Sequence, residues 1–244
     1  MVLLGTIVNG ATIIAGTLIG LLLTKIPEKI RTTVMQGIAL AVMILGVQMA
    51  IQSEEFLIVI LSIVLGGVLG EIWDFDGKLN AAGNWLEQKL GASEQGSVAK
   101  AFVTATLIFV IGALAVLGAL DSGLRGDHSI LYTKALIDGF TSLLLTTTFG
   151  IGVLFSAVPV VLYQGAIALF AVQIERWVPE ALMDSFITEM TSVGGIMIFA
   201  IGLNLLNLTS IRVANFLPGI LVTGVFVTGL YYWETIAAVL PFLS

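Results

Sequence analysis

The first 24 residues, MVLLGTIVNGATIIAGTLIGLLLT, indicate the fold class of the whole chain. A helix needs about 20 mostly apolar residues to cross the hydrocarbon core of a bilayer, and residues 3–24 contain no charged side chain. The segment lacks the basic start and the small-residue cleavage site of a secretory signal peptide. We therefore expect a retained membrane-spanning helix here.

Further apolar runs of similar length follow along the chain. They cover, to within a few residues, 35–52, 55–72, 99–120, 135–157, 159–176, 192–208 and 213–230. Together with residues 3–24 they predict an all-α polytopic membrane protein of about eight transmembrane helices. We expect residues 1–244 to form a single integral membrane domain, with the lipid bilayer as its main partner.

The composition excludes several classes of function. The chain is 58% hydrophobic and only 11% charged, against about 25% charged in a soluble domain. It has no cysteine and a single histidine, His128, which excludes disulfides, thiolate metal sites and two-histidine zinc motifs. A net charge of -6 gives no basic footprint for nucleic acid. With no nucleophile–base pair visible, we expect neither an enzyme nor a bound cofactor or metal.

Residues 73–98 contain the largest charged stretch. Leu79, Ala82, Leu86 and Leu90 recur there at helical spacing, which predicts an amphipathic helix. Such a helix either lies on the membrane surface or packs on the protein, and the pattern does not separate the two.

Two parts of the chain resemble one another. LLLTKIPEKIRTTVMQGIALAVMILGVQ (21–48) and QIERWVPEALMDSFITEMTSVGGIMIFAIGLN (173–204) share an apolar helix, a Pro-Glu step and a glycine-containing apolar helix. Pro27 matches Pro179, Gly46 matches Gly202, and Asn9 can be set against Gln164. We predict repeat A over about 3–72 and repeat B over about 159–230, separated by the connector (about 73–98) and central helices (about 99–157).

The order of the helices predicts how the two copies of this repeat are oriented in the membrane. Helices one to three would correspond to helices six to eight, and an offset of five inverts the second copy in the membrane. Inverted repeats with a site near the midplane are typical of secondary transporters. The alternative is an old duplication that is kept only for packing.

Four amide side chains occupy repeat-matched positions: Asn9, Gln48, Gln164 and Asn204. An amide offers donors and an acceptor without the cost of burying a charge, so four amides near the midplane could bind a small polar solute or a cation. The alternative is ordinary hydrogen bonding between helices.

Lys134 and Asp138 lie four residues apart and share a helix face. Inside the membrane this pair could bind a cation or couple transport to it. The alternative places both residues at the membrane edge, at the start of the helix.

The segment TTTFGIG (146–152) contains three threonines and two glycines. A threonine hydroxyl can bond to the carbonyl four residues earlier and bend the helix, and a broken helix exposes backbone dipoles to a ligand. We name Thr146 and Thr147 as candidate binding residues, and Gly150, Gly152 and Ser156 as candidate gating residues. The alternative is an unbroken helix in which small residues allow close packing.

The middle of the chain resembles a known bacterial multi-pass membrane family, the domain of unknown function 554 family. The resemblance rests on Gly112, Gly118, Asp121-x-Gly123-Leu124, Lys134-x-x-x-Asp138-Gly139, Gly150-x-Gly152-Val153, Phe155-Ser156, Tyr163-Gln164-Gly165 and the opening Gly5-Thr6-x-x-Asn9. It implies an inner-membrane protein of a kind usually described as a possible transporter. It also singles out Lys134, Asp138, Ser156 and Gln164 as motif positions.

The basic residues predict an orientation. With alternating helices, seven Lys and Arg residues (Lys25, Lys29, Arg31, Lys78, Lys89, Lys100 and Arg212) face one side and three (Arg125, Lys134 and Arg176) face the other. The positive-inside rule then places both termini outside the cytoplasm.

The function most in keeping with these features is secondary transport of a small polar solute or cation by alternating access. A passive channel and a non-transporting scaffold or sensor are the alternatives. The G-x-x-x-G pairs Gly16/Gly20 and Gly66/Gly70 permit a homodimer.

Overall fold

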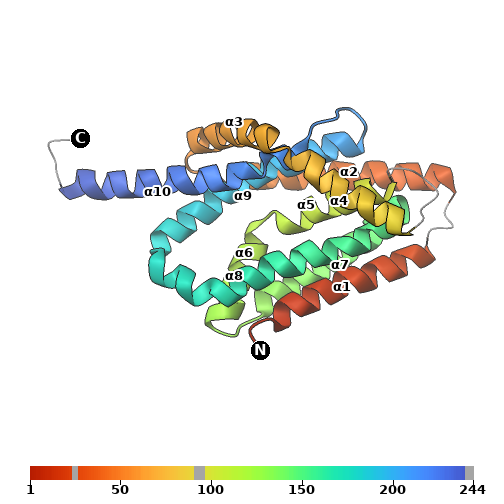
Figure 1. Ribbon diagram of the computed structural model, residues 1–244, viewed down its shortest axis with the longest axis horizontal. Coiled ribbons are helices and arrows are strands. Elements are labelled where there is room, and N and C mark those ends of the chain that lie inside the picture. Colours follow the sequence, from red (N-terminus) through yellow and green to blue (C-terminus); the bar gives the residue numbers. More distant parts are fainter. Residues whose placement is uncertain (24–26, 91–96, 240–244) are drawn as a thin grey trace.

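The computed structural model describes residues 1–23, 27–90 and 97–239, and all regular secondary structure in these ranges is helical (Figure 1). The elements are α1 (Leu4–Leu22), α2 (Glu28–Ala50), α3 (Phe56–Trp73), α4 (Phe75–Leu90), α5 (Ser97–Val110), α6 (Ala113–Leu124), α7 (Ser129–Phe149), the 3-10 segment η1 (Gly150–Ser156), α8 (Ala157–Trp177), α9 (Glu180–Leu205), the 3-10 segment η2 (Val213–Phe216) and α10 (Pro218–Val239). The predicted all-α membrane class is confirmed.

Six helical stretches in the described residues are long and apolar enough to cross a membrane, or seven if the bent pair α5–α6 forms one span. One of the six, Ser129–Trp177, is 49 residues long. At a rise of 1.5 Å per residue it would measure about 74 Å, more than twice the roughly 30 Å core of a bilayer. The predicted number of eight spans stays a prediction.

This long stretch reverses direction at η1. Gly5 approaches Leu131 and Gly20 approaches Thr146, so α1 and α7 run parallel. Asn9, in contrast, contacts Gln164, while Gly165 has Leu3 as its nearest neighbour, so α8 runs antiparallel to α1. The segment η1 is therefore a turn between two antiparallel helices.

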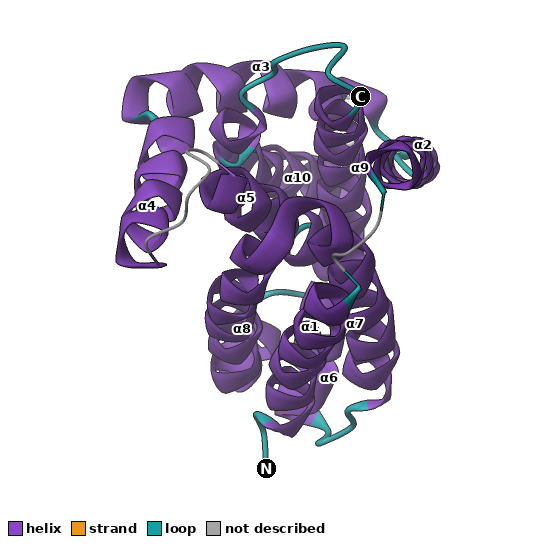
Figure 2. Ribbon diagram, turned by 90° about the vertical axis from the view of Figure 1, so that its right-hand side faces the viewer, coloured by secondary structure: helices purple, strands orange, loops and turns teal. Residues whose placement is uncertain are grey.

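The helices form two groups (Figures 1 and 2). The first group contains α1, α6, α7 and α8, in which α1 packs on α7 and α8, and α6 packs on α7 and α8. The second contains α2, α3, α9 and α10, in which α2 packs on α9 and α3 packs on α10. Between them, α5 packs against η1, α7 and α8 on one side and α4 on the other.

Glycines allow the closest helix pairs to form. A Cβ on Gly16 would lie 2.0 Å from the backbone oxygen of Gly139, at the α1–α7 contact. A Cβ on Gly46 would lie 2.7 Å from the backbone oxygen of Gly195, at the α2–α9 contact. Helices in lipid associate through such close backbone packing, because there is no hydrophobic driving force between them.

Two glycines with positive φ interrupt predicted spans. Gly112 has φ 137°, and α5 and α6 are bent there by 62°. Gly150 has φ 78° and ends α7. An L-residue adopts such angles only with strain, so glycine is required at both breaks.

The outer surface is rich in large apolar side chains. Ile44 on α2, Leu57 on α3, Leu136 on α7 and Leu162 on α8 are among the exposed residues. A water-soluble protein rarely exposes so much contiguous apolar surface, whereas lipid covers it at no cost. This surface is consistent with a membrane location.

The amphipathic connector becomes α4, which packs on α5. Gly83 approaches Ala99, and the buried Glu87 carboxylate accepts a hydrogen bond from the Ala99 amide at 3.4 Å. Trp85 and Leu90 remain exposed. The helix therefore packs on protein through one face while leaving apolar side chains exposed on another, and residues 91–96 of the predicted connector lie outside the described ranges.

Candidate functional site

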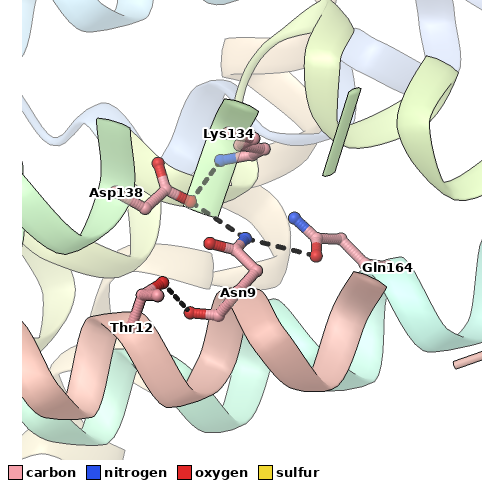
Figure 3. Close-up of polar contacts among 5 residues, drawn as sticks. All are labelled: Asn9, Thr12, Lys134, Asp138 and Gln164. Carbon is pink, nitrogen blue, oxygen red and sulfur yellow. Dashed lines mark hydrogen bonds and ion pairs between the residues drawn. The ribbon is translucent and has the colours of Figure 1, made fainter. Parts of the chain in front are cut away.

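A cluster of four polar side chains lies inside the first helix group (Figure 3). Lys134 Nζ donates to Asp138 Oδ2 at 2.5 Å, and Asn9 Nδ2 donates to the same oxygen at 3.0 Å. Asn9 Nδ2 also donates to Gln164 Oε1 at 3.3 Å. The residues come from α1, α7 and α8, so the cluster joins the first helix of the chain to two consecutive helices more than 100 residues later.

Helix geometry accounts for this convergence. Lys134 and Asp138 are one turn apart on α7, so their side chains meet on one face. The parallel helix α1 carries Asn9 toward Asp138, and the antiparallel helix α8 carries Gln164 toward Asn9. Asp138 is the tenth of the 21 residues of α7, which puts the cluster about halfway along that helix.

The cluster is almost fully buried. The side chains of Lys134 and Asp138 are 7% and 6% exposed, while Asn9 and Gln164 are fully buried. The helix begins at Ser129, five residues before Lys134, so the ion pair does not lie at the helix start. The amide and hydroxyl of Ser129, both bonded to Asp127 Oδ1, occupy that start instead.

Two atoms of the cluster have no hydrogen-bond partner within the described ranges. They are Asn9 Oδ1, an acceptor, and Gln164 Nε2, a donor. The fully buried hydroxyl of Thr6, one turn before Asn9 on α1, also has none there. Buried polar groups are almost always paired in folded proteins, and the two side-chain amide atoms that lack a partner among the described residues both lie in this cluster.

The orientation of both amides is fixed by their neighbours. The oxygen of Asp138 accepts, so Asn9 must present its nitrogen to it. The Asn9 nitrogen has two hydrogens: one is donated to Asp138 and the other to Gln164, so Gln164 must present its oxygen to Asn9. Turning either amide over would set like groups against each other, so the unpaired atoms are Asn9 Oδ1 and Gln164 Nε2.

The structure does not bring all four predicted amides together. Gln48 is exposed on α2, away from Asn9 and Gln164. The half-buried Asn204 holds the loop after α9, where it donates to the carbonyl of Ile211 at 2.7 Å and accepts from Thr209 and from the Ile211 amide. The structure thus brings together only two of the four predicted amides, Asn9 and Gln164, because Asn204 bonds within the loop after α9 and the Gln48 side chain is exposed.

The candidates after Asp138 have local roles. Thr146 donates to the Ser142 carbonyl at 2.6 Å, Thr147 to the Leu144 carbonyl at 2.7 Å, and Ser156 to the Val153 carbonyl at 2.6 Å. A Cβ on Gly152 would lie 2.4 Å from the Val98 carbonyl oxygen, so Gly152 allows η1 to pack on α5. With Gly150 they shape the turn between α7 and α8 and do not touch the four-residue cluster.

Sequence reasoning missed a second buried carboxylate. Glu189 on α9 is 2% exposed and accepts from Ser53 Oγ at 2.6 Å and from the amides of Glu54 and Glu55 at 2.9 and 3.0 Å. It thereby satisfies donors ahead of the first turn of α3. The sequence signal for this residue was a glutamate just before an apolar run. The predicted span started at residue 192 and left Glu189 outside the helix, whereas α9 starts at Glu180 and includes it.

Asn204 also borders a pocket of about 300 Å³ formed by α4, α5, α9 and η2. Its polar lining comes from Asp76, Asn80, Lys100, Thr104 and Asn204, and apolar side chains supply the rest. Burial raises the pKa of the Asp76 carboxyl, although the nearby Arg212 guanidinium opposes this shift. The described residues contain no group of three or more His, Asp or Glu side chains that could hold a metal ion.

The comparisons with known proteins agree with this picture of a membrane domain. Residues 4–228 match the model of a family described as "Protein of unknown function (DUF554)". The chain is 35% identical over 223 residues to the uncharacterized membrane protein YdfK of Bacillus subtilis, covering 89% of this chain and 93% of that protein. It is 26% identical over 223 residues, with the same coverage, to the uncharacterized protein YqgA of Escherichia coli. No solved structure matches the chain.

The family match runs from the first turn of α1 into α10 and includes every helix that builds the cluster. Because it covers nearly the whole chain, the chain belongs to the DUF554 family of membrane proteins.

Proposed function

We propose that this protein is a secondary transporter that moves a small polar solute or cation by alternating access. The observation that carries the proposal is the buried cluster of Asn9, Lys134, Asp138 and Gln164. Ionisable groups inside a membrane domain are costly, so they are rare and usually mark a pathway for a solute or proton. The unpaired atoms of Asn9 and Gln164 add capacity for a guest.

The predicted inverted repeat gains support from the helix contacts. Asn9 and Gln164, at matched positions in repeats A and B, bond to each other. Gly46 contacts Phe199 and Gly195, and its counterpart Gly202 contacts Met43 and Ala39 in the same reciprocal manner. Repeat A thus places α1 in the first helix group and α2 and α3 in the second. Repeat B likewise places α8 in the first group and α9 and α10 in the second.

This arrangement suits alternating access. The two copies meet at α2–α9, at α3–α10 and at α1–α8, and the cluster lies at the last of these contacts. Transporters of this kind bind near the interface of their repeats. The breaks at Gly112 and Gly150 supply places where helix segments can turn relative to one another. We assign no chemical reaction to the chain, and its partners are the bilayer and the solute.

For its location, we propose the bacterial inner membrane with both termini outside the cytoplasm. The packing supports the predicted sides: Lys100 lies over the ring of Phe149 at the last turn of α7, 5.9 Å from its centroid. Ser122, near Arg125, bonds instead to the carbonyl of Val2 at the start of α1, the opposite end of the same helix group.

Transport in proteoliposomes tests the proposal. A panel of tracer ions and small uncharged solutes is offered to vesicles that contain the wild-type protein, Asp138→Asn or Asp127→Asn. The exposed Asp127 is the matched control because it lies outside the cluster. We expect uptake that Asp138→Asn reduces at least tenfold and Asp127→Asn leaves unchanged. Undiminished uptake with Asp138→Asn would exclude the coupling role of this residue.

A further inference from the structure

We infer that the site between α1 and α8 takes a small solute of no net charge that carries both a hydrogen-bond donor and an acceptor, such as an amide or a polyol, and does not take a bare ion. This inference deepens the proposed transport function and rests on it. It follows from the charge balance of the cluster, from its unpaired atoms and from the space beside them.

The first step is the charge balance. Lys134 and Asp138 neutralise each other in direct contact, so the cluster has no net formal charge. A bare cation or anion entering beside them would leave one uncompensated charge in a region that holds both side chains away from solvent. Burying an unpaired charge is far more costly than burying a paired one, so a guest without net charge fits this site best.

The second step is the pattern of unpaired atoms. Gln164 Nε2 needs an acceptor and Asn9 Oδ1 needs a donor. A metal cation could satisfy only the oxygen, and a halide only the nitrogen. A hydroxyl or amide compound donates and accepts at once, and the unpaired Thr6 hydroxyl can serve it in either role.

The third step is the space beside these atoms. A Cβ built on Gly165, next to Gln164, would meet only Leu3 Cδ2 at 3.6 Å and Thr6 Cγ2 at 4.0 Å among the described residues. At most other glycines where two helices meet, a built Cβ would lie less than 3 Å from an atom of the neighbouring helix. Room for at least one further atom therefore remains at the α1–α8 contact, at the residue next to Gln164.

Comparing the uptake of uncharged probes with the uptake of ions tests the inference. Proteoliposomes are offered radiolabelled urea, glycerol and acetamide as uncharged solutes, and sodium, rubidium and chloride as ions. We expect saturable uptake of at least one uncharged probe, at least tenfold above vesicles without protein, and no uptake of the ions. Gln164→Leu should reduce that uptake tenfold or more.

Two variants separate an effect on the guest from misfolding. Gly165→Ala adds one methyl group where only ordinary contacts await it, so we expect normal expression but at least threefold lower uptake. Gly37→Ala, with no described atom within 4 Å of the new methyl group, is the control and should not change uptake.

The ion pair supplies a further readout. Asp138→Asn leaves Lys134 unpaired, and the double variant Lys134→Gln/Asp138→Asn restores a neutral site. An uncharged guest predicts uptake at least threefold higher in the double variant than in Asp138→Asn. A cation that needs the carboxylate predicts no recovery.

The outcomes are distinguishable. Ion uptake that requires Asp138, without uptake of uncharged probes, would overturn the inference and keep the proposed function. Uptake of no probe would also overturn it, and the unpaired atoms would then be assigned to a buried water. In that case the proposed transport function would be tested by labelling the thiol of Gln164→Cys with a membrane-impermeant reagent, which shows whether water reaches the cluster.

Discussion

The Lys134–Asp138 pair links the candidate site to the stability of the protein. Removing one partner of a buried ion pair typically costs about 3–5 kcal/mol, because the other charge is left uncompensated. Replacing both partners by neutral side chains of similar shape costs much less.

We therefore predict that Asp138→Asn and Lys134→Gln each lower the free energy of unfolding by about 3 kcal/mol or more, whereas the double variant recovers part of the loss. Thermal unfolding of the detergent-purified protein measures the effect. Arg125→Gln is the control, because Arg125 pairs with Asp121 at the same four-residue spacing but its side chain is 72% exposed, so its loss should cost about 1 kcal/mol or less. Equal effects at both pairs would contradict a buried, charged pair.

Glu189 offers a second prediction at the level of single residues. Its carboxylate accepts from one hydroxyl and two backbone amides ahead of α3. Glu189→Gln keeps the shape but weakens three charge-assisted bonds, and we expect a loss of about 1–3 kcal/mol in the free energy of unfolding. Thermal unfolding again provides the measurement, and an unchanged midpoint would show that these bonds add nothing to stability.

Among the helices, the α1–α7 contact is the one most dependent on small residues. A methyl group on Gly16 would overlap the hydroxyl of Ser142 and the backbone of Gly139, and the backbone cannot move without separating the helices. We predict that Gly16→Ala costs at least about 2 kcal/mol through overpacking and lowers the yield of folded protein. Gly37→Ala, which meets no described atom, should be neutral or slightly stabilising. Equal yields of the two variants would contradict the close approach of α1 and α7.

The sequence predicts the helical class well because an apolar run of about 20 residues has the length and hydropathy of a bilayer-spanning helix. It also predicts that Lys134 and Asp138 meet, since their spacing alone puts them on one face. Helix starts are less well predicted: α2 and α9 start at Glu28 and Glu180, seven and twelve residues before the predicted runs at 35 and 192. Their first turns are polar and give no hydropathy signal.

What the sequence could not give is the partner of each amide. Asn9, Gln48, Gln164 and Asn204 look alike as polar residues in apolar helices, but only two of them face another helix of the same group. That distinction depends on how the helices assemble and on the last turn of α9, where the Asn204 amide bonds to the loop. The break at Gly112 likewise follows from a positive φ that a lone glycine in an apolar run does not reveal.

At the scale of the molecule, the proposed mechanism requires α1 and α8 to move relative to each other. A Cβ on Gly165, on α8, would lie 4.0 Å from Thr6 Cγ2, on α1, so cysteines at these two positions would face each other at a distance that a small shift of the helices closes to a disulfide. The chain has no cysteine of its own, so the pair Thr6→Cys/Gly165→Cys would form an unambiguous cross-link.

We predict that oxidation of this double variant reduces uptake of a transported probe at least tenfold and that a reducing agent restores it. Each single-cysteine variant, treated with the same oxidant, is the control: the substitution itself lowers its uptake, and the oxidant should lower it no further. Full uptake by the cross-linked protein would contradict a mechanism in which the two copies move at this contact, and would favour a passive channel.

The most direct measurement asks whether water reaches the buried cluster, and it needs no knowledge of the substrate. Gln164→Cys places a single thiol at the fully buried position, and Leu162→Cys places one on the exposed apolar face of the same helix, where Leu162 is 67% exposed. A charged, membrane-impermeant thiol reagent is applied to sealed vesicles of each orientation, since only a hydrated thiol ionises and reacts. Alternating access predicts that the thiol of Gln164→Cys reacts from both sides, whereas the thiol of Leu162→Cys reacts from neither. A Gln164→Cys thiol that reacts from neither side would contradict transport through this site and leave the cluster as a set of structural bonds between helices.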